Sequence, residues 1–241
     1  MKNMFKLFFV LVFIYVNTFA MQAKAQDNNK YLPLSSKSDE AINDFRQALM
    51  RLHNADMTNY KLLMDKALAA DPTFFMANAN WALQLIPGKD QTKADAQIDK
   101  TLALPQTGLT PAEQIVRSMI VKLKDNRKAD LKPELTQLTT KYPDVRSAFV
   151  LAADVSRFIM NDGETAFNYL QKVTELDPNF GPAYNLIGYY YMDKKQMDKA
   201  KEAFDKYMAL SPNEANAYDS MGEFYMNSGN FDKSAELYDK A

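Results

Sequence analysis

The feature that most constrains this chain is a stretch that occurs twice, 34 residues apart. Residues 176–188 read LDPNFGPAYNLIG, and residues 210–222 read LSPNEANAYDSMG. Prolines recur at a similar interval: Pro72, Pro105, Pro143, Pro178 and Pro212. Their separations are 33, 38, 35 and 34 residues. Proline lacks a backbone N–H and biases the preceding residue away from helical geometry, so it commonly stands just after a helix. Self-similarity at this period indicates stacked helical repeats.

Aligning the two copies shows which positions repeat. Residues 178–207 and 212–241 match at 12 of 30 positions. The positions that define the first copy are Tyr184, Ile187, Gly188, Tyr191, Ala200, Phe204 and Pro212. Those of the second are Tyr218, Met221, Gly222, Tyr225, Ser234 and Tyr238. This pattern resembles the tetratricopeptide repeat, an antiparallel helix pair of about 34 residues. Tyr207 departs from it, because the family has a small residue there.

The resemblance implies an all-α fold: a right-handed α-solenoid of stacked antiparallel helix hairpins, with about five and a half to six repeats. It covers residues 39–241, clearly over 144–241 and in degenerate form over 39–143. Where the two helices of a hairpin touch, a small side chain is needed to let their backbones approach. The candidates for these positions are Ala82, Ser118, Ala153, Gly188 and Gly222. A glycine inside a helix costs about 1 kcal/mol relative to alanine, and close contact of the helices would compensate this cost at Gly188 and Gly222. Tyr184 and Ile187 should fill the core.

Proline also shapes the third copy. Pro133 would interrupt a full-length second helix, so this helix should begin late, near Leu131, with Pro133 in its first turn. Leu131, Leu135 and Leu138 then share one face of that helix.

The first 25 residues have the three parts of a secretory signal peptide. Two lysines precede the ten-residue apolar run Leu7–Val16, and the segment ends in Ala23-Lys24-Ala25. The run is too short to span a membrane. We expect cleavage after Ala25 and a periplasmic or secreted protein, the alternative being an uncleaved anchor. Residues 26–38 are polar and aperiodic, and they indicate a flexible lead-in.

Composition excludes several classes of function. Removing residues 1–25 takes out three lysines and moves the formal net charge from −1 to −4, which argues against nucleic acid as a partner. Without cysteine there is neither a disulfide nor thiolate chemistry. The single histidine, His53, reads as a surface or capping residue, and carboxylates alternate with lysines as on solvated helix faces. We therefore expect no enzyme activity, no catalytic residue, no metal site and no cofactor.

The resemblance places binding on the concave surface, which the first helices of the hairpins line. The expected groove residues are Asn185, Tyr189, Met192, Asp219, Glu223 and Met226, with Asp193 and Asn227 beside them and Val150, Asp154 and Arg157 in the fourth copy. The family's basic clamp for a carboxylate terminus is absent at these positions. Their acids, amides, tyrosine and methionines suit a protein or peptide with basic and apolar side chains.

The sequence stops at Ala241, inside the second helix of the last hairpin and without a closing proline. Repeat arrays need a terminal unit with a polar outer face. The chain is therefore expected either to be the N-terminal sensor or scaffold segment of a longer regulatory or enzymatic protein, or to have this face covered by a partner. A second copy of the chain is one such partner, through the uncapped final helix.

Overall fold

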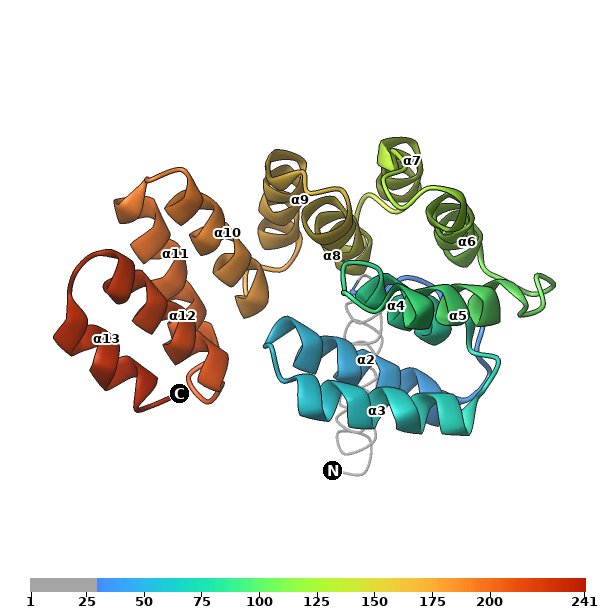
Figure 1. The fold of residues 1–241 in the computed structure, drawn as a ribbon, viewed down its shortest axis with the longest axis horizontal. Helices are drawn as coiled ribbons and strands as arrows, with labels where there is room; N and C mark the ends of the chain where they lie inside the picture. The colour runs from blue at the N-terminus through green and yellow to red at the C-terminus, as the bar shows by residue number, and fades with distance from the viewer. Residues whose placement is uncertain (1–29) are drawn as a thin grey trace, which may run out of the picture.

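The computed structural model describes residues 30–241, and within that range every regular element is a helix (Figure 1). The predicted signal peptide, residues 1–25, lies outside the described residues. The elements are α2 (Asp39–His53), α3 (Met57–Ala70), α4 (Phe75–Leu85), α5 (Gln91–Leu102), α6 (Pro111–Asp125), α7 (Lys132–Lys141), α8 (Arg146–Asp154), the π-helical turn η1 (Val155–Ile159), α9 (Gly163–Leu176), α10 (Gly181–Asp193), α11 (Met197–Leu210), α12 (Ala215–Asn227) and α13 (Phe231–Tyr238). None of the helices in this range is long and apolar enough to cross a bilayer.

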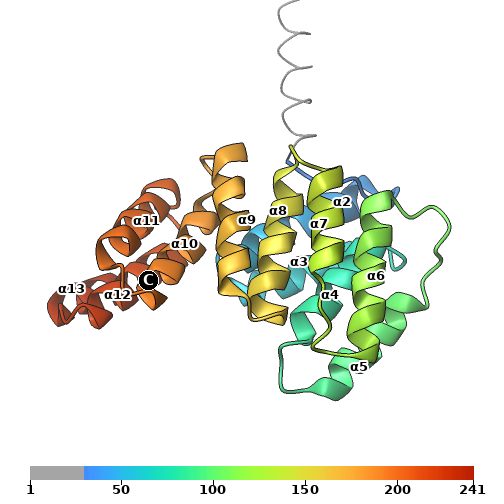
Figure 2. The same cartoon turned by 90° about the horizontal axis from the view of Figure 1, so that it is seen from above.

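Consecutive helices pair as antiparallel hairpins, which confirms the predicted α-solenoid. The pairs are α2–α3, α4–α5, α6–α7, α8–α9, α10–α11 and α12–α13. They follow one another around an arc, so that the first pair and the last two pairs face each other across its open side (Figure 1). Seen from above, α6 to α9 stand side by side while the hairpins at both ends lie across them (Figure 2).

Local sequence explains where several helices begin. The Ser38 side chain accepts a hydrogen bond from the backbone N–H of Ala41 and starts α2. Thr110 and Glu113 form a reciprocal capping box at α6, which satisfies two of the free N–H groups of its first turn. Helix α7 begins at Lys132 with Pro133 in its first turn, as predicted from the proline. The three leucines expected on one face, Leu131, Leu135 and Leu138, are fully buried.

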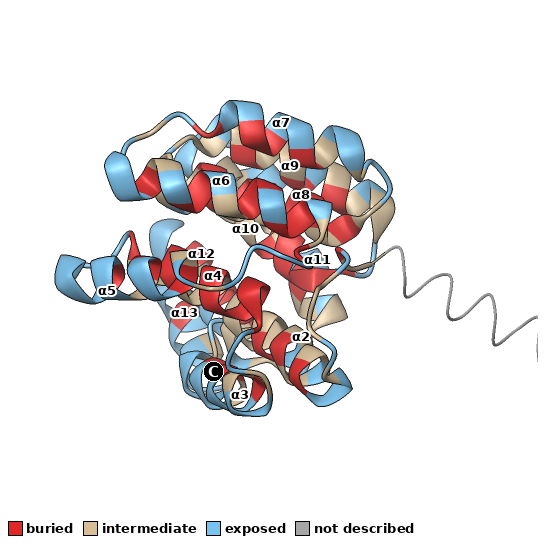
Figure 3. Ribbon diagram, turned by 90° about the vertical axis from the view of Figure 1, so that its right-hand side faces the viewer, coloured by how far each residue is buried: buried red, intermediate tan, exposed pale blue. Residues whose placement is uncertain are grey.

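The core runs continuously between the two layers of helices (Figure 3). One cluster of buried apolar side chains extends from Leu32 to Ala203 and includes parts of every hairpin but the last. A second, small cluster joins the last two hairpins, and its buried members are Ala200, Phe204, Met221 and Phe224. Because each hairpin packs mainly on its neighbours, the array depends on local contacts along most of its length.

The small residues of the hairpins do not all serve the role expected of them. Ala82 and Ala153 are buried at their contacts, whereas Ser118 is exposed and donates a hydrogen bond to Glu134 of α7. At Gly188 the close neighbour is a ring: an added Cβ would lie 2.6 Å from Cε1 of Phe204. The glycine therefore makes room for the buried aromatic residue of the second helix.

Two other expectations need correction. Ile187 is buried, but Tyr184 is only half-buried, because its hydroxyl reaches outward to donate to the carbonyl of Pro178 at 3.1 Å. The sequence predicts a flexible lead-in over residues 26–38; residues 26–29 lie outside the described residues, and residues 30–38 are irregular but hydrogen-bonded to several helices. Ser35 donates to Glu113, and Ser36 donates to Asp71 at 2.6 Å.

The two hairpin glycines should respond differently to alanine. Gly188→Ala forces a methyl group onto the buried ring of Phe204, and we expect the free energy of unfolding to fall by about 1–3 kcal/mol. Gly222→Ala meets the partly exposed ring of Tyr238 at 3.0 Å, which can move aside, so higher helix propensity should offset the contact. Urea unfolding followed by circular dichroism measures both. Equal destabilisation by the two substitutions would contradict this account.

Candidate functional site

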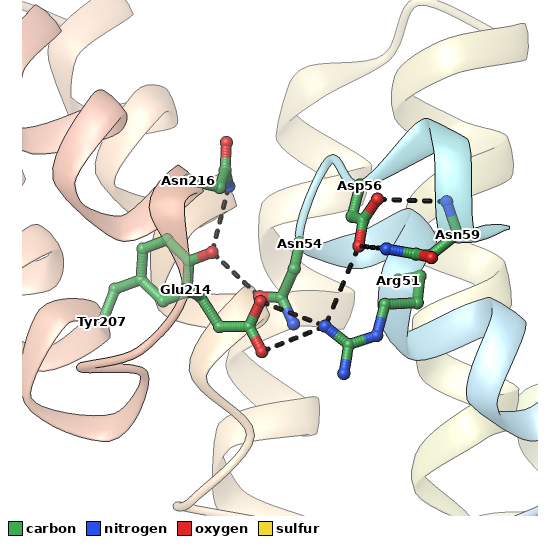
Figure 4. Close-up of polar contacts among 7 residues, drawn as sticks. All are labelled: Arg51, Asn54, Asp56, Asn59, Tyr207, Glu214 and Asn216. Atoms are coloured by element: carbon green, nitrogen blue, oxygen red, sulfur yellow. Dashed lines mark hydrogen bonds and ion pairs between the residues drawn. The ribbon is translucent and has the colours of Figure 1, made fainter. Parts of the chain in front are cut away.

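The arc is closed by a contact between hairpins that are far apart in the sequence (Figure 4). The hydroxyl of Tyr207, in α11, donates to Oδ1 of Asn54 at 2.9 Å, just after α2. The same hydroxyl accepts a hydrogen bond from Nδ2 of Asn216, in α12, at 3.0 Å. Beside it the guanidinium of Arg51 lies 3.5 Å from the carboxylate of Glu214. The turn of the first hairpin is thus joined to the junction of the last two.

The neutral hydrogen bonds contribute more to this closure than the ion pair does. Tyr207 is fully buried and Asn54 nearly so, so breaking their bond would leave buried polar atoms without partners. Arg51 is partly exposed, and an exposed ion pair contributes about 0–1 kcal/mol. Burial also raises the pKa of Tyr207 to about 12, so the hydroxyl remains a protonated donor well above pH 10.

The closure bounds a cavity of about 420 Å³ on the concave side. The first helices of the hairpins supply most of its wall, as the resemblance implied, with contributions from the turns that end α2 and α4. The apolar members of the wall are Leu52, Ala55, Pro87, Val150, Phe158, Leu170, Phe180, Pro182, Ala183 and Leu186. The polar members are His53, Gln84, Asp154, Asn185, Tyr189 and Asn216. Among the described residues, no lysine or arginine lines this cavity.

Asn185 is a polar group in this wall with unused bonding capacity. Its side chain is 7% exposed, and its Oδ1 has no hydrogen-bond partner among residues 30–241. A buried carbonyl oxygen without a partner costs about 1–3 kcal/mol. The buried Asn78 of α4 shows the contrast, because its side chain donates to the carbonyl of Phe74 at 3.0 Å and contacts Gln97.

His53 and Asp154 form the floor of the site. Nε2 of His53 lies 3.0 Å from Oδ2 of Asp154, and both side chains are mostly buried. The imidazole ring also stands edge-on to Phe180, with 5.8 Å between the ring centroids. The sequence indicated a surface or capping histidine. The residue does end α2, but its side chain points inward and contacts Asp154, which lies 101 positions later in the sequence.

The structure brings some of the predicted groove residues together and separates others. Tyr189 donates to Oε2 of Glu223 at 2.8 Å and joins α10 to α12, while burial raises the pKa of the Tyr189 hydroxyl. Asn185 and Tyr189 line the cavity of about 420 Å³. Asp219 and Met226 are exposed on α12.

The remaining predicted residues lie elsewhere or take other partners. Met192, Asp193 and Asn227 line a different hollow near the end of α10. Val150 and Asp154, predicted from the fourth copy, line the cavity of about 420 Å³. Arg157, predicted from the same copy, does not line this cavity, and its guanidinium lies 5.8 Å from the ring of Phe158.

Several cavity residues had no motif to mark them. Phe180 precedes α10, and Phe158 is presented by the π-helical turn η1 at the end of α8. Such turns often occur at functional sites. One sequence signal did point to the closure: Tyr207 stands where the family has a small residue, and its extra length reaches Asn54.

The described residues contain no group of three or more histidine, cysteine, aspartate or glutamate side chains that could hold a metal ion. The wall of the cavity carries one histidine and one carboxylate, and these two groups are bonded to each other. Within residues 30–241 the arrangement suits binding by shape and hydrogen bonding.

Comparison with known proteins places the repeat in a family. The tetratricopeptide repeat model matches residues 181–214 and 215–241, which are the last two hairpins. No curated protein matches the chain in sequence.

Similar solved structures include PilW, a TPR protein in Thermus thermophilus and MamA. For PilW, described as a widely conserved type IV pilus biogenesis factor, the identity is 18%, the TM-score is 0.47, and 83% of this chain and 91% of that chain are covered. For a thermophilic TPR protein in Thermus thermophilus the identity is 15%, the TM-score is 0.46, and 83% of this chain and 89% of that chain are covered. For MamA the identity is 17%, the TM-score is 0.36, and 84% of this chain and 90% of that chain are covered. The family match, rather than these distant structures, identifies the repeat.

The closing hydrogen bonds should be measurable in stability. Tyr207→Phe leaves Oδ1 of Asn54 buried without its donor, and we expect the free energy of unfolding to fall by about 1–2 kcal/mol in urea. Tyr184→Phe is the matched control, since its hydroxyl bonds at the exposed surface and its loss should change stability by less than about 0.5 kcal/mol. Equal effects would show that Tyr207 does not close the arc through its hydroxyl.

Alkaline pH should weaken the fold through the same residue. The pKa of Tyr207 is about 12 in the folded chain and about 10 when unfolded, so between these values the unfolded state binds fewer protons. Stability therefore falls as pH rises from 10 to 12, by up to about 1.4 kcal/mol per pH unit for this group. Tyr207→Phe should show a shallower fall in urea titrations at pH values of about 9 to 11. An unchanged slope would contradict the assignment.

Proposed function

The last two hairpins of this chain are tetratricopeptide repeats, and we propose that the protein is a non-enzymatic scaffold that binds a protein or peptide on its concave face. Stacked helix hairpins of this kind serve as protein-interaction modules. The proposed site is the cavity beside the Tyr207–Asn216 contact, continued along α10 and α12 by Tyr189 and Glu223. The other proposed groove residues, Met192, Asp219 and Met226, would contact parts of the partner outside the cavity.

The observation that carries the proposal is the unpaired Oδ1 of Asn185 in the wall of the cavity. A fold does not keep such an atom without cost, and rotation of the Asn185 amide toward the cavity would let a bound peptide N–H satisfy its oxygen. Apolar side chains around it, among them Leu186 and Phe180, offer a surface for an aliphatic or aromatic residue of the partner.

Charge narrows the class of partner. Among the described residues the cavity wall has neither lysine nor arginine, and α12 presents Asp219 and Glu223 beside it. Met192 and Met226 add adaptable apolar surface. A segment with an apolar residue for the cavity and a lysine or arginine beside it would complement these groups.

Export belongs to the same proposal. The basic start, the apolar run and the Ala23-Lys24-Ala25 ending support secretion across the inner membrane. A periplasmic or secreted scaffold would then hold its partner in the envelope or outside the cell.

The partner can be located by crosslinking from within the cavity. A photoreactive benzoylphenylalanine at Leu186, in the full exported chain, should crosslink a protein in living cells. The control is the same group at Leu62, an exposed residue of α3 on the outer layer. Capture from Leu62 and not from Leu186 would overturn the proposed site.

Asn185→Leu should then separate stability from binding. It removes an unsatisfied buried oxygen, so the free energy of unfolding should stay unchanged or rise by up to about 1 kcal/mol, while capture from Leu186 is lost. Asn78→Leu is the matched control: it removes satisfied hydrogen bonds and should cost about 2 kcal/mol without affecting capture by the folded fraction. Capture that survives Asn185→Leu would contradict the proposed role of Asn185.

A further inference from the structure

Residues 30–36 have no regular secondary structure and contact the starts of α6 and α8 and the end of α3, which hold their backbone and side chains as they would hold a peptide. The N–H of Ser147, at the start of α8, donates to the carbonyl of Lys30 at 3.1 Å. Its hydroxyl accepts from the N–H of Leu32 at 2.7 Å. Ser147 thus both donates to and accepts from the backbone of the segment, and these two bonds do not depend on the segment's side chains.

Two further residues, both at the start of α6, continue this grip. Thr110, which caps α6, donates its hydroxyl to the carbonyl of Pro33 at 3.0 Å. Glu113 of the same helix accepts from both the N–H and the hydroxyl of Ser35. The hydrogen bonds to Ser147, Thr110 and Glu113 join positions 77 to 117 residues apart, so they form only in the tertiary structure.

The side chains of the segment occupy distinct slots. The ring of Tyr31 lies against two guanidinium groups, 4.2 Å from that of Arg46 and 5.4 Å from that of Arg146. Asp177 holds Arg146 in place with a contact of 2.6 Å. Leu32 is 6% exposed and enters the apolar space between α2, α4 and α8, whereas Pro33 faces solvent.

The segment does not fill its groove completely, although Leu32 itself belongs to the main cluster of buried apolar side chains. A cavity of about 70 Å³ remains between it and the helices, and Nε of both Arg46 and Arg146 is buried without a hydrogen-bond partner among the described residues. Core interiors are close-packed and their polar atoms are satisfied.

We propose that the groove between α2, α6 and α8 is a second peptide-binding site, selective for an aromatic residue followed by leucine, and that residues 31–33 occupy it in cis. A partner segment of this chemistry would exchange with them. The cis segment continues directly into α2, so its effective concentration is in the millimolar range and it masks the site from weaker ligands. This site is separate from the one proposed around Asn185.

The test uses the full chain and a labelled peptide of residues 30–37, KYLPLSSK. The double variant Tyr31→Ala, Leu32→Asp should release the cis segment and bind the peptide at least about tenfold more tightly than the wild type, by fluorescence anisotropy. Adding Arg46→Gln should weaken this binding, while Arg157→Gln, outside the groove, should not. A folded double variant that does not bind the peptide, or binds it no better than a scrambled peptide, would overturn the proposal.

Hydrogen exchange on the wild-type chain covers the case in which the double variant does not fold. The amide of Leu32 should exchange at least about 100-fold faster than that of the core residue Leu135, because release of the segment leaves the hairpins intact. Excess peptide should speed its exchange further. Equal protection of the two amides would show that the segment is a fixed part of the core and would refute a cis ligand.

Discussion

The buried hydroxyl of Tyr207, bonded to Asn54 and Asn216, joins the two ends of an otherwise open stack of hairpins. Along the stack each hairpin contacts its neighbours, and such contacts alone fix a curvature only approximately. A hydrogen bond across 153 residues fixes the distance between the first hairpin and the last two. The bond brings α11 and α12 against the turn after α2, beside the cavity that Leu52 and Asn216 help to line.

This constraint also divides the inner surface. On one side residues 30–36 fill the space between α2, α6 and α8, and on the other the cavity around Asn185 stays open. The two regions share the wall formed by His53, Val150, Asp154 and Phe180. A scaffold built in this way would offer one open site and one site that is masked by its own chain, with a common boundary through which occupancy of one could affect the other.

The repeat pattern predicted the hairpins well because its signals are local. Pro133 predicted the late start of α7, and the glycines at 188 and 222 predicted where room is needed between paired helices. The same pattern could not predict that residues 30–38 would be hydrogen-bonded to the helices, since their partners lie 35 to 117 positions away. It placed Asn185 and Tyr189 on the concave face, but it did not distinguish them from Asp219 and Met226, which point to solvent.

By itself the sequence determined the helices, their pairing and the face each one buries, because these depend on spacings of three, four and 34 residues. It also determined the absence of cysteine chemistry. Only the tertiary structure decided which side chains share a cavity. His53 meets Asp154 across 101 residues and Tyr207 meets Asn54 across 153, and no local period encodes such contacts. They arise from the summed rotation of successive hairpins, to which each interface contributes a small part.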